Sequence, residues 1–88
     1  MFLPTEGVMD AEACMVHGQV KHPGEEWKTM SREEHIAHLQ GHWDEYLAGV
    51  RADHESGLSP LAHLICRASF LAWHDKHGGQ NEAPSGNL

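Results

Sequence analysis

Histidine and acidic side chains are concentrated between Ser31 and Trp73, at spacings that could build one polar site. His42 would lie on a first long helix, Asp53 in an acidic turn and His63 near the start of a second helix. Folding the two helices back on each other would bring these three side chains to a common point. Imidazole and carboxylate groups together can bind a divalent metal, with magnesium favouring oxygen ligands and zinc or manganese accepting nitrogen. The spacing therefore predicts a metal site made by His42, Asp53 and His63.

The turn itself supplies two candidate catalytic carboxylates, Asp53 and Glu55. Carboxylates beside a bound metal can hold it and orient a water molecule for attack on phosphorus. The alternative is a purely structural one, because Asp is common in turns and often caps them. Both interpretations of the turn stay open on the sequence alone.

Four further residues are candidates for holding a ligand. Arg67 can clamp phosphate oxygens with its planar fork, or it can be a solvated Arg on an exposed face. Lys21 and His63 could add positive charge or hydrogen bonds near the phosphates. Trp27 stands in a polar loop, where it either fills the edge of the core or forms a wall of the ligand site.

The elements that must position these residues are helical. Val8 to His17 is a short candidate helix, with residues 1–7 irregular before it and Gly18 as a stop after it. Ser31 to Glu34 has the pattern of a capping box, and Gly49 is typical of a helix end. Between them an apolar stripe recurs at helical spacing and should face the core: Ile36, Leu39, Trp43, Leu47 and Val50. His35 and His38 are expected on the solvated side of this helix.

Ser59 followed by Pro60 predicts the start of the second long helix. One face of it is apolar, through Leu61, Leu64, Ile65, Ala68, Leu71 and Ala72, and the opposite face carries His63, Arg67, Phe70 and His74. A helix with two such faces should contact a ligand or a second subunit as well as its own core. We expect an all-α helical hairpin with a short N-terminal helix, packed into a homo-oligomer. It would form one domain over residues 1–79, followed by a polar tail over 80–88.

Composition narrows the class of partner. The net charge of −7 argues against nucleic acid or an anionic membrane as a main partner, because both require a basic face. The two cysteines, Cys14 and Cys66, cannot make a disulfide framework and are expected to be small buried side chains in a reducing compartment. No apolar run approaches the roughly 18 residues of a membrane span. Met1 to Pro4 does not resemble a signal peptide. We therefore expect a cytoplasmic protein.

The order of residues also resembles a known family, the dATP/dGTP diphosphohydrolase N-terminal domain, a small domain common in phages and prophages. The resemblance covers roughly residues 8–75. Its looser part is Gly18-x-x-Lys21-x-x-Gly24-x-x-Trp27, and its most specific part is Asp53-x-Glu55-Ser56-Gly57-Leu58-x-x-Leu61-Ala62-His63. The resemblance implies an α-helical domain associated with purine deoxynucleoside triphosphates, and, if the chain is phage-encoded, residence in the host cytoplasm.

Three functions are compatible with this sequence. One is metal-dependent hydrolysis of dATP or dGTP to monophosphate and pyrophosphate. A second is a nucleotide-sequestering oligomer without turnover, whose ligand could include a host immune signalling nucleotide. The third is a histidine-rich structural oligomer. Nucleotide identity, metal identity, oligomer size and the roles of His35, His38, His74 and His77 stay open.

Overall fold

The structure, a computed structural model, describes residues 2–21 and 23–77, so the expected tail over 80–88 lies outside the described residues. It contains three α-helices, α1 (Thr5–Lys21), α2 (Arg32–Leu47) and α3 (Pro60–His77), and a short 3-10 helix, η1 (Glu26–Lys28). The described residues contain no strand. The prediction of an all-α domain with a two-helix hairpin and one further helix is confirmed.

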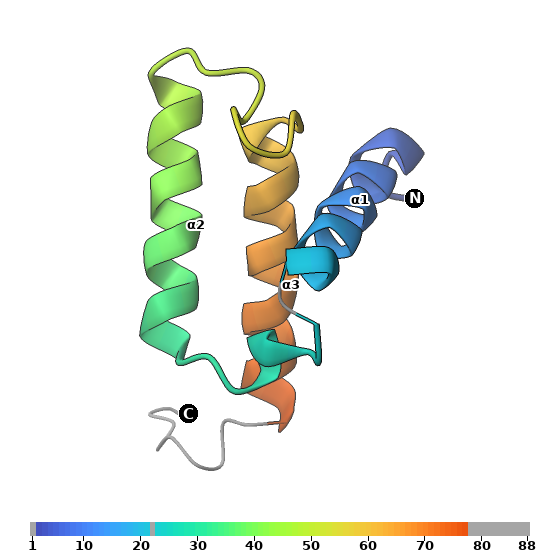
Figure 1. Cartoon of the computed structure of the whole chain (residues 1–88), viewed down its shortest axis with the longest axis vertical. Coiled ribbons are helices and arrows are strands. Elements are labelled where there is room, and N and C mark those ends of the chain that lie inside the picture. The colour runs from blue at the N-terminus through green and yellow to red at the C-terminus, as the bar shows by residue number, and fades with distance from the viewer. Residues whose placement is uncertain (1, 22, 78–88) are drawn as a thin grey trace.

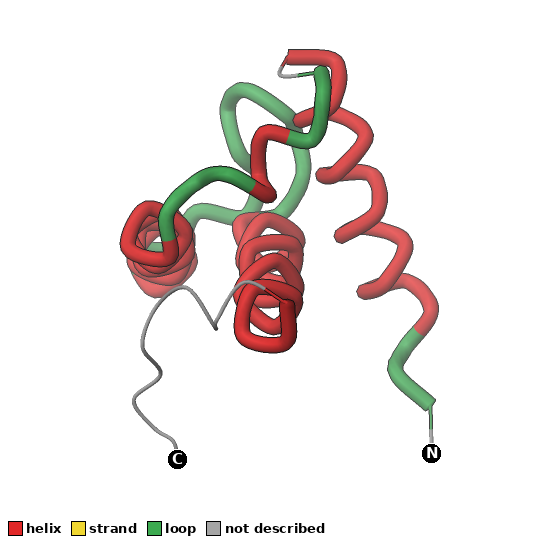
Figure 2. The backbone as a smooth tube through the Cα atoms, turned by 90° about the horizontal axis from the view of Figure 1, so that it is seen from below, coloured by secondary structure: helices red, strands yellow, loops and turns green. Residues whose placement is uncertain are grey.

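The long helices α2 and α3 lie side by side and run in opposite directions (Figure 1). Seen from below, α3 lies between α2 and α1 (Figure 2), and it contacts both of them. The segment with η1 crosses in front of the lower part of α3 in Figure 1 and contacts it. The central helix α3 therefore carries the packing of the whole domain.

Local sequence signals set the ends of the hairpin helices. The Ser31 hydroxyl accepts a hydrogen bond from the Glu34 amide (3.1 Å), and the Glu34 side chain accepts one from the Ser31 amide (3.0 Å), which completes the capping box. At the other end of α2, Gly49 has φ of 99° and its amide donates to Tyr46. The Val50 amide donates to the Glu45 carbonyl, so α2 ends in a Schellman motif.

The first helix is longer than predicted at both ends. Thr5 to Gly7 are helical rather than irregular, and α1 continues through Gly18 to Lys21. A glycine inside a helix costs only about 1 kcal/mol relative to alanine. The packing of α1 on α3, and an ion pair from Lys21 to Glu55 (2.8 Å), oppose that cost at the end of the helix.

The two long helices face each other through their polar stripes, which reverses the predicted packing of α2. His35, expected in solvent, is 0% exposed, while Ile36 (45%), Trp43 (40%) and Leu47 (64%) of the expected core stripe are exposed. On α3, the face with His74 points inward, and Ile65, Ala68 and Ala72 are exposed. Hydrogen bonds explain the inversion, because His35 and His74 both donate from Nε2 to the Trp27 carbonyl (2.9 and 3.0 Å). The interior is therefore built from imidazoles, aromatic rings and thiols rather than from the aliphatic stripe.

No described helix combines the length and the apolar character that crossing a membrane requires.

Candidate functional site

A pocket of about 450 Å³ lies where the second half of α1, η1, α2, α3 and the loop between the hairpin helices meet. It is lined by every residue that the sequence suggested for catalysis, ligand binding or metal binding: Lys21, Trp27, His42, Asp53, Glu55, His63 and Arg67. Antiparallel pairing of α2 and α3 accounts for this convergence, since it sets His42 against His63 with their rings stacked at 4.6 Å.

Asp53 is fixed by the loop that carries it. Its Oδ2 accepts hydrogen bonds from the amides of Glu55 (3.0 Å) and Ser56 (2.9 Å), and Gly57, with φ of 77°, donates to the Asp53 carbonyl. Burial raises the pKa of the Asp53 carboxyl, but these amide hydrogen bonds outweigh it and hold the pKa below its usual value. One Asp53 oxygen therefore accepts the hydrogen bonds that hold the turn. The carboxylate stays negatively charged, which metal binding would also require.

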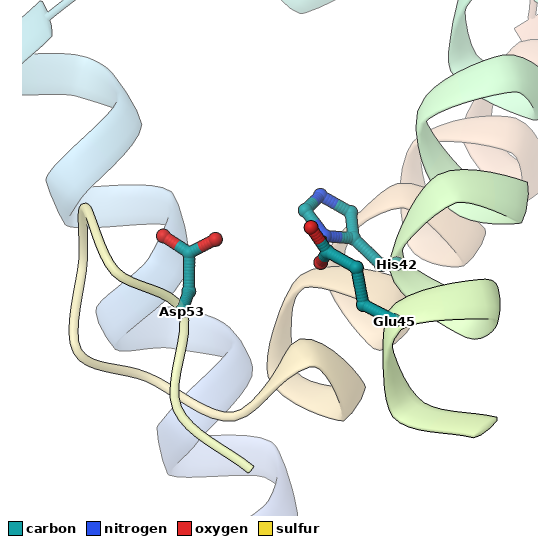
Figure 3. A group of neighbouring side chains, drawn as sticks. All are labelled: His42, Glu45 and Asp53. Carbon is teal, nitrogen blue, oxygen red and sulfur yellow. The ribbon is translucent and has the colours of Figure 1, made fainter. Parts of the chain in front are cut away.

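The closest group of metal-type ligands joins this carboxylate to α2. One ligand atom from each of His42, Glu45 and Asp53 lies within 4.8 Å of the others. Figure 3 shows the Asp53 carboxylate pointing from the loop across to His42 and Glu45 on α2. One imidazole nitrogen with two carboxylates is a donor set that suits manganese or zinc, and magnesium through the oxygens. The chemistry of these three side chains therefore fits a divalent ion.

Glu45 was not predicted as part of this group, although its spacing from His42 indicates that the two side chains are neighbours on the helix. It stands three residues after His42 on the same helix face, and the His42 Nδ1 lies 3.2 Å from its Oε1. The apolar stripe of α2 led to the prediction that the opposite face of this helix is buried. That prediction places Glu45 in solvent, away from the site.

His63 lies beside the group rather than in it. Its Nε2 is 2.7 Å from the Ser56 hydroxyl and its Nδ1 is 3.0 Å from the Cys14 sulfur, so both ring nitrogens are occupied. Burial, and secondarily the positive charge that His42 can carry, lower the pKa of His63. The His63 ring is stacked on His42 and helps to fix the orientation of that imidazole.

The three remaining polar candidates are held by other protein groups. Lys21 binds Glu55 across the pocket mouth, and this hydrogen bond lowers the pKa of the Glu55 carboxyl. Arg67 Nη1 donates to His35 Nδ1 (3.0 Å) and to the Met30 sulfur (3.2 Å). Burial lowers the pKa of the Arg67 guanidinium, which nonetheless stays charged at neutral pH because its ordinary pKa is far above 7.

Trp27 packs against aromatic side chains at the edge of the core and also lines the pocket. Its ring stacks on Phe70 at 4.6 Å and meets Trp73 edge-on at 5.1 Å, so it seals the lower end of the hairpin. The same ring lines the pocket. Its indole Nε1 is buried without a hydrogen-bond partner, and so is the Nε2 of His17, another pocket residue. Buried polar atoms normally have a partner, and these two nitrogens have none among the described residues.

Two pocket histidines, His17 and His38, were not predicted as part of the site, whereas Phe70 stands on the face of α3 that was expected to contact a ligand or a second subunit. His38 stands one helical turn before His42, which is a signal for a shared face. Burial and the charge of Arg67 lower the pKa of His38. His17 could not be placed from sequence, because the helix that carries it was predicted to end there.

Comparisons with curated proteins and with solved structures gave no match. A family model described as dATP/dGTP diphosphohydrolase, N-terminal, matches residues 1–83, which is wider than the stretch that carried the resemblance. The resemblance is therefore confirmed. The chain belongs to the dATP/dGTP diphosphohydrolase N-terminal domain family.

Proposed function

We propose that this chain binds a purine deoxynucleoside triphosphate together with a divalent metal in the pocket, and hydrolyses dATP or dGTP to the monophosphate and pyrophosphate. The observation that carries the proposal is the group of His42, Glu45 and Asp53 at a pocket that also holds an indole ring and two cationic side chains. The substrate class comes from the family to which the chain belongs.

The pocket offers separate places for the two ends of such a ligand. Trp27, which stacks on Phe70 and has Lys28 over its ring at 5.6 Å, lines the pocket and can contact a purine base. Its unpartnered Nε1–H could donate to a ring nitrogen or a carbonyl of the base. Lys21 and Arg67 line the same pocket and can meet the negative charge of the phosphates.

A bound divalent ion would neutralise phosphate charge and lower the pKa of a bound water. The chain's own carboxylates then have distinct tasks. Asp53 and Glu45 would hold the ion together with His42, while Glu55 is the candidate base. Phosphate entering the pocket would compete for Lys21 and release Glu55 from its ion pair. Glu55 could then take a proton from the water that attacks the α-phosphorus, with pyrophosphate as the leaving group.

A second candidate is nucleotide sequestration without turnover by a homo-oligomer, of the kind a phage could direct against host signalling nucleotides. Two observations favour it. Both loop carboxylates are already engaged, Glu55 by Lys21 and one Asp53 oxygen by backbone amides, so neither is poised as a base before a ligand enters. The outward apolar stripes of α2 and α3 offer surface that a second copy of the chain could cover.

One incubation separates these functions. The protein is mixed with dATP or dGTP and manganese or magnesium and is then separated from free nucleotide by gel filtration. The nucleotides in both fractions are identified after denaturation. Hydrolysis predicts monophosphate that disappears in Glu55→Gln while nucleotide binding survives. Sequestration predicts intact triphosphate recovered with the protein in both forms. If neither product nor retained nucleotide is found, both functions are wrong. Glu33→Gln, an exposed change near the start of α2, is the matched control.

A further inference from the structure

The two cysteines lie together in the wall of the pocket, and neither has a task in the proposed function. Cys14 comes from α1 and Cys66 from α3, and α1 packs directly on α3. Both side chains are buried, at 8% and 7% exposed, and both line the pocket. Buried cysteines were expected, but no pattern in the sequence places residues so far apart in the chain beside each other.

The contacts of the two sulfurs distinguish them from inert core thiols. The Cys14 sulfur is 3.0 Å from His63 Nδ1, and Cys66 stands one helical turn after His63 on α3, so Cys14 lies against the face of α3 that carries Cys66. A hydrogen bond from the Cys14 thiol lowers the pKa of Cys66, and the same interaction together with burial raises the pKa of Cys14. Arg67, the next residue after Cys66, further lowers the pKa of Cys66. A thiol whose pKa is lowered by a neighbouring thiol is the usual arrangement of a redox-active pair.

We propose that Cys14 and Cys66 form a reversible intrachain disulfide when a small peroxide enters the pocket. The Cys66 thiolate attacks one peroxide oxygen and the O–O bond breaks, so that Cys66 becomes a sulfenic acid. The hydroxide that leaves takes up the proton that Cys66 had released and becomes the first water. The Cys14 sulfur then attacks the Cys66 sulfur and displaces hydroxide, which takes the Cys14 proton to give water. Overall two thiols and one hydrogen peroxide give one disulfide and two waters. A dithiol reductant reverses the reaction by thiol–disulfide exchange.

The disulfide would lock α1 onto α3 at the pocket wall. In the reduced protein α1 is attached to the hairpin by side-chain packing and by the Lys21–Glu55 ion pair, which is exposed. An exposed ion pair contributes little to stability. A covalent link between helices that are far apart in sequence restricts the unfolded chain, so the oxidised protein should melt at a higher temperature. The inference is independent of whether the pocket binds a nucleotide.

The test uses the intact chain at low protein concentration. The folded protein is treated with hydrogen peroxide, alkylated under denaturing conditions and analysed by mass spectrometry. We expect the wild type to lose two hydrogen atoms, to accept no alkyl group and to recover both thiols with a dithiol reductant. Cys14→Ser removes the second thiol, so a sulfenic acid should accumulate on Cys66 and be trapped by dimedone. Cys66→Ser should show no rapid oxidation of Cys14.

Other outcomes would overturn the proposal. These are two thiols that remain open to alkylation after treatment, a stable oxygen adduct on one cysteine of the wild type, or chains linked to one another. Because the wild-type masses decide the matter, the test holds even if a serine variant folds poorly. Circular dichroism before oxidation shows whether each variant is folded. An unchanged melting temperature after disulfide formation would leave the bond in place but contradict its effect on α1.

Discussion

His35 shows how a single side chain sets the interior of this domain. The ring is fully buried, its Nε2–H donates to the Trp27 carbonyl, and its Nδ1 accepts from Arg67. Both nitrogens are therefore committed in the neutral form, and a second proton on Nδ1 would face the Arg67 guanidinium. The histidine that helical periodicity predicts in solvent is the one that joins α2, α3 and η1.

The first prediction concerns the pH dependence of stability. Burial, followed by the charge of Arg67, lowers the pKa of His35 in the folded protein below its usual 6.5. The unfolded chain then binds more protons than the folded one in the acid range. Stability should be fully present above pH 6.5 and fall as the pH drops below it. Urea unfolding between pH 8 and pH 5 measures this.

A matched pair of variants assigns the effect to His35. Removing the exposed His54 through His54→Gln should leave the pH dependence unchanged, whereas His35→Gln should flatten it as well as destabilise the fold. His63 and His38 also have lowered pKa values, so a residual slope is expected in His35→Gln. A slope identical to that of the wild type would contradict the assignment.

The second prediction separates the two roles of Asp53. Asp53→Asn keeps an oxygen that can accept the Glu55 and Ser56 amides but loses the negative charge. Manganese affinity should fall about 10-fold or more, while the free energy of unfolding changes by less than about 1 kcal/mol. Asp53→Ala should weaken both. Calorimetric titration and urea unfolding provide the two readouts.

The control for Asp53→Asn is Asp44→Asn, which neutralises an exposed carboxylate on α2 that accepts a hydrogen bond from Gln40. It should leave manganese affinity nearly unchanged. If Asp53→Asn reduces stability as strongly as it reduces affinity, Asp53 is a turn-capping residue and nothing more.

At the scale of elements, the ends of the two hairpin helices could be predicted, and the ends of α1 and the buried faces could not. Ser31, Gly49 and Pro60 act through hydrogen bonds and dihedral angles within a few residues, so their patterns were sufficient to locate the ends of the hairpin helices. The convergence of His42 and Asp53 at the pocket followed from the hairpin alone.

The reversed packing of α2 depends on contacts between residues that are distant in sequence, and the periodicity of one helix does not reveal such contacts. The stripe with Ile36 and Leu47 is apolar and evenly spaced, yet the opposite face occupies the interior because it satisfies the Trp27 carbonyl twice and brings Arg67 to a hydrogen-bond acceptor. The same limit applied to Gly18, since only the packing of α1 on α3 shows why the helix continues through it.

The third prediction uses two glycines with opposite roles. Gly49 has φ of 99°, a conformation that a Cβ disfavours, so Gly49→Ala should destabilise the domain by about 1 kcal/mol. Gly18 lies inside α1, and a Cβ added there would meet nothing within 4 Å, so Gly18→Ala should stabilise by up to about 1 kcal/mol. Thermal and urea unfolding give both values. Effects of the same sign would contradict the assigned helix ends.

At the scale of the whole molecule, the exposed surface of the hairpin includes large apolar side chains. Trp43 and Leu47 on α2 are exposed, as is Ile65 on α3. Domains of this size bury only a modest share of their surface, and association is a common way to add burial. We therefore expect the chain to be a homo-oligomer that covers these stripes.

The fourth prediction tests that assembly. Leu47 is 64% exposed, so Leu47→Glu should cost a monomer no more than about 0.5 kcal/mol. In an oligomer built on this stripe it would bury an unpaired charge and shift the protein to monomer. Native mass spectrometry and light scattering measure the change. A wild type that is monomeric at all concentrations would exclude the assembly, and Glu33→Gln serves as the surface control.

The polar interior also has a thermodynamic consequence. The heat capacity of unfolding rises mainly with the apolar area that becomes exposed, and an ordinary chain of this length would give about 1.2 kcal/mol/K. Here the buried side chains include two imidazoles and two thiols, while aliphatic residues face outward. For the monomeric Leu47→Glu protein, scanning calorimetry should give a clearly smaller value. A small heat capacity change flattens the curve of stability against temperature. The free energy of unfolding of this domain should therefore change little between cold and warm conditions.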